Sequence, residues 1–160
     1  MPSSLGKLGE DYAAAYLDQL GYRLVAANFI LPVGRNLRGA VVKAESDVEK
    51  MFSGGKAKLR PLYDALLKLG LKTGKEAKAC PCQTIVPLYR NHVFAQIKPT
   101  TQTRIDMGFA LGDMKPTGRL IDTGGFAKKD RITHRIPITS IDDIDDEVKH
   151  WLKVAYDRDA

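Results

Sequence analysis

Seven residues between positions 98 and 135 carry the side chains best suited to chemistry or ligand binding. They comprise four cations, one carboxylate, one phenyl ring and one imidazole: Lys98, Arg104, Asp106, Arg119, Phe126, His134 and Arg135. Guanidinium groups hold phosphate or carboxylate groups through paired N–H donors. Because no nucleophile with an activating base accompanies them, these residues predict binding, and we expect no catalytic residue, metal ligand or cofactor.

The spacing of these residues predicts that several share one face of a sheet. Arg104 and Asp106 are two positions apart in a strand-like segment, and alternate residues of a strand point to the same side. If helices leave that side open, it forms a basic surface for nucleic acid or for a phosphate or carboxylate ligand. The alternative for the same residues is a solvated sheet face with weak ion pairs.

Other polar groups favour structural roles. His134 has no acidic partner beside it in sequence, so we expect it to be hydrogen-bonded within the fold, although a base or ligand role stays open. The acids of residues 142–147 suit the first turns of a helix better than a metal site. Residues 123–126, TGGF, lack the lysine of a phosphate-binding loop. Cys80 and Cys82 are expected to be free thiols.

A metal-dependent nuclease or hydrolase is a further alternative. Gln96 and Lys98 imitate half of an acid-x-lysine strand, but the preceding strand supplies no acid to hold a metal. The remaining candidate combines Glu10, Asp106 and His134, and it requires these three side chains to meet in space. A protein–protein interaction module is the other alternative to a surface that binds anions.

Apolar periodicity predicts an α+β fold in which an antiparallel meander packs against helices. Ser46 with Glu49 indicates a helix start, Pro61 fits the first turn of a longer helix, Pro87 indicates an edge strand or bulge, and Ser140 with Asp143 indicates the start of a C-terminal amphipathic helix. The expected helices cover about 5–20, 46–53, 59–69 and 140–158, and the expected strands 22–31, 83–89, 92–98, 104–111, 119–122 and 134–139.

Composition fits one soluble domain. The chain has 160 residues, 44% hydrophobic and 28% charged, with a net charge of +6, which favours contact with polyanions. We expect a helix–strand extension over residues 1–40 and a compact domain over 41–160. The N-terminal segment lacks an uninterrupted apolar core, and no later run is long enough to span a membrane, so we expect a cytoplasmic protein without membrane contact.

Two segments resemble known families. Residues 42–160, with FSGGKAKLRPLYDALL, PTGRL, GGF and THRIPITSIDDID, resemble an uncharacterised bacterial domain of unknown function found at the C-terminus of predicted transport proteins. That resemblance implies no activity or cofactor, but some relatives carry a nuclease-like domain ahead of this module, which implies a nucleic-acid context. Residues 5–29 are similar to the first helix and strand of an uncharacterised endonuclease-like family, with Glu10 as the matching acid.

Overall fold

The computed structural model describes residues 45–160, which fold into one six-stranded antiparallel sheet and several helices. The expected helix over 5–20, the strand after it and the extension over 1–40 lie outside the described residues. The described elements are a helix over 45–51, η2 (Gly54–Leu59), α3 (Arg60–Leu71), β1 (Lys78–Ala79), β2 (Val86–Tyr89), β3 (Val93–Pro99), β4 (Ile105–Phe109), β5 (Ile121–Asp122), β6 (His134–Ile138), η3 (Ile141–Asp143) and α4 (Asp146–Arg158).

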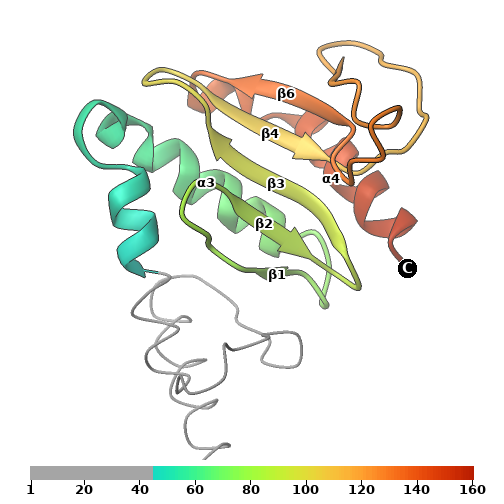
Figure 1. Cartoon of the computed structure of the whole chain (residues 1–160), viewed down its shortest axis with the longest axis horizontal. Helices are drawn as coiled ribbons and strands as arrows, with labels where there is room; N and C mark the ends of the chain where they lie inside the picture. Colours follow the sequence, from blue (N-terminus) through green and yellow to red (C-terminus); the bar gives the residue numbers. More distant parts are fainter. Residues whose placement is uncertain (1–44) are drawn as a thin grey trace, which may run out of the picture.

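The six strands form one antiparallel sheet in the order β1-β2-β3-β4-β6-β5 (Figure 1). The first four strands are a meander, which was expected for β2, β3 and β4 but not for β1, and β6 then adds to the free side of β4. The short β5 lies at the edge, because the chain between β4 and β6 returns along the outer side of β6. The predicted α+β class with an antiparallel sheet and a C-terminal helix is therefore confirmed.

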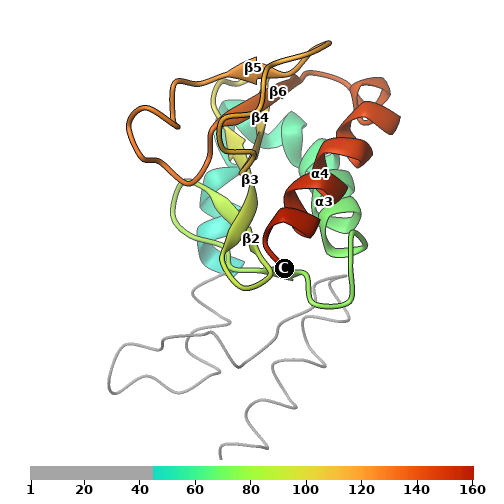
Figure 2. The same ribbon diagram turned by 90° about the vertical axis from the view of Figure 1, so that its right-hand side faces the viewer.

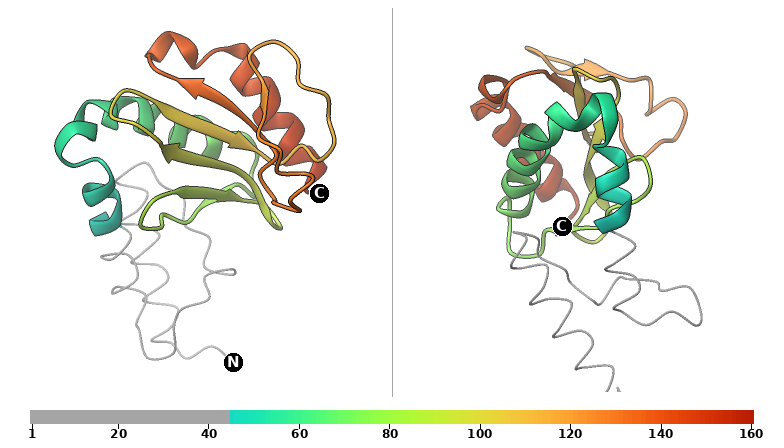
Figure 3. Two further views of the ribbon diagram at one scale, coloured as in Figure 1. Left: turned by 45° about the horizontal axis from the view of Figure 1, so that its top comes forward. Right: turned by 90° about the vertical axis from the view of Figure 1, so that its left-hand side faces the viewer.

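Register separates the two faces of the sheet. Met107 lies opposite Ile97 on β3 and Ile136 on β6, and all three side chains are fully buried. This face packs against α3 and α4, which lie together on one side of the sheet when it is viewed along its edges (Figures 2 and 3). The opposite face, turned toward the viewer in Figure 1, is not covered by these two helices.

Helix α3 follows η2 without a break and buries one stripe. Pro61 lies in its first turn, where backbone N–H groups have no partner within the helix, so the N–H that proline lacks is not needed. Leu62, Leu66 and Leu67 are buried against the sheet, and Gly70 lies so close to Leu88 that a side chain there would clash. The helix was expected to end at residue 69, just before Gly70. Gly70 instead belongs to its last turn, where the missing side chain lets the helix approach Leu88 closely.

The C-terminal helix begins later than its sequence suggests. The capping box of Ser140 and Asp143 forms, but it caps the short η3. Helix α4 has its own cap, Asp145, whose carboxylate accepts hydrogen bonds from the N–H groups of Glu147 and Val148. The prediction of one continuous helix from Ser140 was wrong because two consecutive caps are present.

Two further expectations were corrected. Ser46 is already helical and caps nothing, since residue 45 also belongs to that helix. Pro87 lies on β2, which is an inner strand between β1 and β3. The bulge expected near Pro87 occurs at Leu88/Tyr89, and β1 pairs only with those two residues of β2. None of the described helices has the length and apolar character needed to cross a membrane.

Candidate functional site

The uncovered sheet face carries four of the seven candidate residues. Lys98 lies opposite Asp106, and Arg135 lies opposite Gly108, so their positions share the face that α3 and α4 leave open. Arg104 immediately precedes β4 and also reaches Asp106. We call Lys98, Arg104, Asp106 and Arg135 the open-face cluster. Lys98 and Arg135 are two strands apart, which is roughly 10 Å.

Asp106 is the centre of the open-face cluster. Its Oδ1 lies 3.0 Å from Nε of Arg104 and accepts a hydrogen bond from Nη1 of Arg135 at 2.9 Å. Its Oδ2 accepts from the Thr100 hydroxyl at 2.6 Å. Asp106 is 8% exposed, whereas the two arginine side chains are about one-third exposed. The carboxylate therefore anchors both guanidinium groups while leaving N–H donors at the surface.

A hollow of about 670 Å³ adjoins this cluster at the β3–β4 turn. Three lysines line it: Lys50 from the helix over 45–51, Lys56 from η2 and Lys98 from β3. Hydroxyl groups of Ser53, Thr84 and Thr100 and the amides of Gln83 and Gln102 complete its polar wall. Within residues 45–160 no Asp or Glu lines it. We call it the lysine hollow.

The three lysines of this hollow have no ion-pair partner among residues 45–160. The ammonium group of Lys56 donates a 2.8 Å hydrogen bond to the carbonyl of Pro99, which fixes it beside the β3–β4 turn. Lys50 and Lys98 form no side-chain ion pair with the described part of the chain. Three lysines that line one hollow with no carboxylate in its described wall favour the binding of an anion.

Arg119 does not join the open-face cluster. It reaches the start of α4, where its Nη2 lies 2.6 Å from Asp145 Oδ1, its Nε lies 2.9 Å from Glu147 Oε2, and its Nη1 lies 3.8 Å from Asp143 Oδ1. Gly118 has a positive φ of 59°, and a side chain there would clash with Glu147. The PTGRL turn therefore places Arg119 among acids in a structural ion-pair cluster.

His134 is buried and hydrogen-bonded within the fold. It is 1% exposed, with Nδ1 2.8 Å from the Thr133 hydroxyl and Nε2 2.7 Å from the carbonyl of Met114. Register places it opposite Phe109 on the helix-covered face, whereas Asp106 is on the open face. The hydrolase alternative needed Asp106 and His134 on one side. Glu10, its third member, lies outside the described residues.

Phe126 lies in a second hollow, of about 660 Å³, between the end of β4, the β5–β6 connection and the end of α4. Its side chain is 58% exposed, and Lys129, Arg131 and Arg158 line the same hollow. We call this the aromatic hollow. It is separate from the open-face cluster, because the two sites share no lining residue and lie toward opposite ends of β4.

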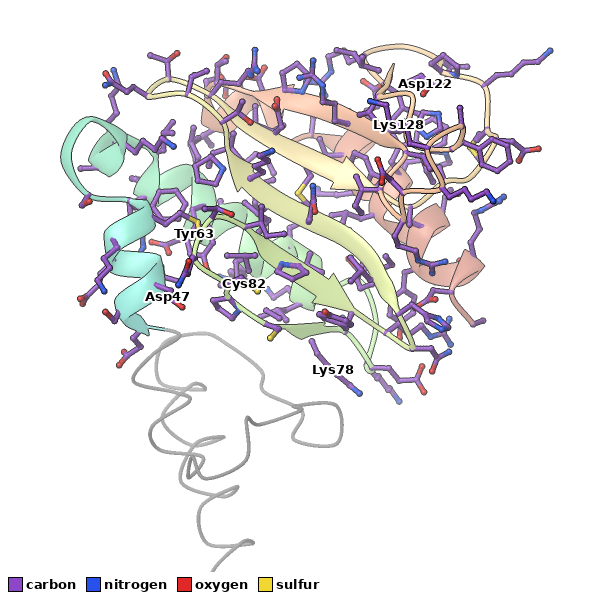
Figure 4. The ribbon with its side chains drawn as sticks, in the orientation of Figure 1. Asp47, Tyr63, Lys78, Cys82, Asp122 and Lys128 are labelled. Atoms are coloured by element: carbon purple, nitrogen blue, oxygen red, sulfur yellow. The ribbon has the colours of Figure 1, made fainter. Side chains whose placement is uncertain are left out.

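Metal ligands and thiols contribute little to these surfaces. Among residues 45–160 no three His, Cys, Asp or Glu side chains gather as a possible metal site. Cys80 and Cys82 are free thiols, and burial together with Cys82 raises the pKa of Cys80. In Figure 4, Cys82 lies near the β1–β2 connection, well away from Asp122 and Lys128 beside β6.

Sequence reasoning missed Lys50 and Lys56. Helix α3 separates both residues from the strands in the sequence. They reach Lys98 because the helix over 45–51 and η2 pack beside the β3–β4 turn. The available signal was the basic run of Lys56, Lys58 and Arg60 after Gly54, to which we assigned no binding role.

Comparison with known proteins identifies the family. No curated protein and no solved structure gives a significant match to this chain. The family model described as "Domain of unknown function (DUF5655)" matches residues 48–159, which is almost the whole of the described structure. The match covers the sheet, α3, α4 and both hollows, and the chain therefore belongs to the DUF5655 family.

Proposed function

We propose that this domain binds nucleic acid through the phosphate backbone, with the lysine hollow and the open-face cluster as the contact surface. The observation that carries the proposal is the convergence of Lys50, Lys56 and Lys98 on one hollow that no described carboxylate lines. Lysine ammonium groups bind phosphates as point charges and release counterions from the polymer. The net charge of +6 adds long-range attraction to the same partner.

The adjoining cluster extends this surface along the sheet. Arg104 donates to Asp106 from Nη2 and Arg135 donates from Nη1, and their remaining exposed N–H groups can bind phosphate oxygens. The cluster contributes three cations against one carboxylate. Lys98 belongs to both sites, so a phosphate chain that crosses the sheet meets positive charge from the hollow to β6.

Contacts of this kind read charge rather than sequence. The cations of the lysine hollow and of the open-face cluster suit phosphate groups, which carry no sequence information, although the amides of Gln83 and Gln102 also line the hollow. We therefore propose a binding function without catalysis, in which the domain holds nucleic acid of any sequence in the cytoplasm. The nuclease-like neighbours implied by the family resemblance are consistent with such a role.

Fluorescence anisotropy with a random-sequence 20-base-pair DNA duplex tests the proposal. We expect saturable binding whose affinity falls steeply between about 50 and 200 mM salt, because each displaced counterion contributes a slope of roughly −0.9. In the triple variant Lys50→Gln, Lys56→Gln, Lys98→Gln, the salt slope should decrease by about three.

The matched control removes three lysines from the helix side. Lys68, Lys149 and Lys153 are exposed on α3 and α4. Replacing all three by Gln lowers the net charge from +6 to +3, as the first triple variant does. We expect this control to keep most of the affinity. Equal losses in the two triple variants overturn the proposal, and so does DNA binding that salt leaves unchanged, because phosphate contacts weaken steeply with added salt.

A further inference from the structure

The aromatic hollow combines an exposed ring with uncompensated cations. Lys129 and Arg158 line it beside Phe126, and neither side chain makes a hydrogen bond or ion pair within residues 45–160. Arg131 is partly committed, since it donates to Asp159 at 2.6 Å and to the carbonyl of Val93 at 2.9 Å. Asp130 is the one acid among the described lining residues.

The turn that presents Phe126 is built by hydrogen bonds. Asp122 Oδ1 accepts from the N–H of Gly124 at 2.7 Å, and the hydroxyl of Thr123 donates to the carbonyl of Thr133 at 3.0 Å. The N–H of Asp130 donates to the carbonyl of Gly125 at 2.8 Å and closes the loop. Figure 4 shows Asp122 and Lys128 on this segment, beside β6. The ring therefore projects from an ordered loop.

Glycine at position 125 is required by this arrangement. A side chain there would clash with the carbonyl oxygen of Ile132, so the strand returning to β6 passes directly against the turn. Lys129 has a left-handed φ of 60°, which is uncommon for a residue with a side chain. The TGGF motif thus lacks a phosphate-loop role, and its glycines instead fold a tight turn with Phe126 at the tip.

We propose that the aromatic hollow is a binding site for nucleoside monophosphates, independent of the phosphate-backbone surface. The base stacks on Phe126, because every base offers a π-face to an exposed ring. The phosphate lies between Lys129 and Arg158, whose charges have no other partner among the described residues. The volume of about 660 Å³ accommodates a small ligand of this class.

Isothermal titration calorimetry with adenosine 5′-monophosphate tests this site in the full chain. We expect saturable one-site binding that is roughly tenfold weaker in Phe126→Leu, where an apolar side chain remains but stacking is lost. Arg158→Gln should weaken binding of the nucleotide and reduce its dependence on salt. Because Phe126 and Arg158 are exposed, both variants should keep the thermal unfolding midpoint of the parent.

Comparison ligands and a control variant separate the parts of the proposal. Adenosine tests stacking without phosphate, ribose 5-phosphate tests phosphate without a base, and both should bind more weakly than the nucleotide. Lys98→Gln should bind the nucleotide as the parent does, whatever its effect on DNA. Absence of nucleotide binding, equal binding of ribose 5-phosphate, or an unchanged affinity in Phe126→Leu each overturns the proposal.

Discussion

Arg119 and the open-face cluster use the same side-chain chemistry in opposite ways. Arg119 faces three carboxylates at the start of α4, so its charge is more than compensated. On the open face, one carboxylate, Asp106, serves two arginines, and Lys98 adds a further cation. The number of carboxylates around a cation therefore determines whether the cation stabilises the fold through ion pairs or stays available to bind a ligand.

The difference follows from which elements meet at each place. The PTGRL turn brings Arg119 to a helix start, where Asp145 caps α4 and Glu147 stands in its first turn. Acids are favoured there by the helix dipole whether or not a cation is near. The β3–β4 turn instead meets η2, whose first turn contains no acid, and lysines dominate the contact.

Replacing Arg119 by Met should give the largest effect on stability. The substitution leaves three carboxylates close together without their cation, and we expect the free energy of unfolding to fall by about 2 kcal/mol in urea titrations. DNA affinity should stay within about twofold of the parent. Lys128→Met, at an exposed lysine of the β5–β6 connection, is the control and should change stability by less than about 0.5 kcal/mol. A large loss of DNA binding in the Arg119 variant contradicts the comparison.

Asp106→Asn should separate stability from binding on the open face. The neutral amide holds Arg104 and Arg135 less strongly, so we expect a loss of about 1–2 kcal/mol of unfolding free energy. The same change adds one positive charge to the surface, and DNA affinity should rise by about threefold at low salt. Weaker DNA binding by a folded Asp106→Asn protein shows that the carboxylate contributes to the partner contact, contrary to the proposal.

Lys98→Gln should affect binding alone. Its side chain is exposed and makes no hydrogen bond or ion pair within residues 45–160, so the unfolding free energy should change by less than about 0.5 kcal/mol. The salt slope of DNA binding should decrease by about one, since one phosphate contact is lost. An unaltered slope removes Lys98 from the proposed surface.

Lowering the pH should weaken the ion pairs of Arg119 and so reduce the free energy of unfolding, but by less than the Arg119→Met substitution does. The Arg119 side chain lowers the pKa of Glu147 from its ordinary 4.5, and hydrogen bonds from Thr139 lower the pKa of Asp143 from its ordinary 3.8. A lowered pKa means that the stabilisation is complete above the unfolded-state value and is lost as the pH falls through the folded-state value. Both groups are largely screened by solvent, so we expect a loss of less than about 1 kcal/mol between pH 6 and pH 3.

The Arg119→Met variant should show a flatter acid dependence than the parent. The remaining dependence comes in part from Asp159, whose pKa is lowered although burial opposes its ionisation, because the N–H groups of Asn91 and His92 and the guanidinium of Arg131 outweigh that burial. Urea titrations at several pH values measure the difference. Parallel curves for the two proteins contradict the role assigned to Arg119.

Local patterns predicted the sheet well and the binding surface in part. Alternation of apolar residues located β3, β4 and β6, and it placed Arg104 with Asp106 on one face. It did not show that Arg119 turns away to α4, because that depends on the path of the PTGRL turn. Lys50 and Lys56 were missed for a similar reason, since their approach to Lys98 is a tertiary contact that no sequence spacing encodes.

Amide chemical-shift mapping with the 20-base-pair duplex tests the central claim most directly. In ¹H–¹⁵N spectra recorded at low salt, we expect the largest shifts around the lysine hollow and the open face, at Lys56, Lys98, Gln102 and Arg135. The amides of Arg119 and Glu147 should move little. Shifts concentrated at the start of α4, or spread evenly over both helices, would contradict the account.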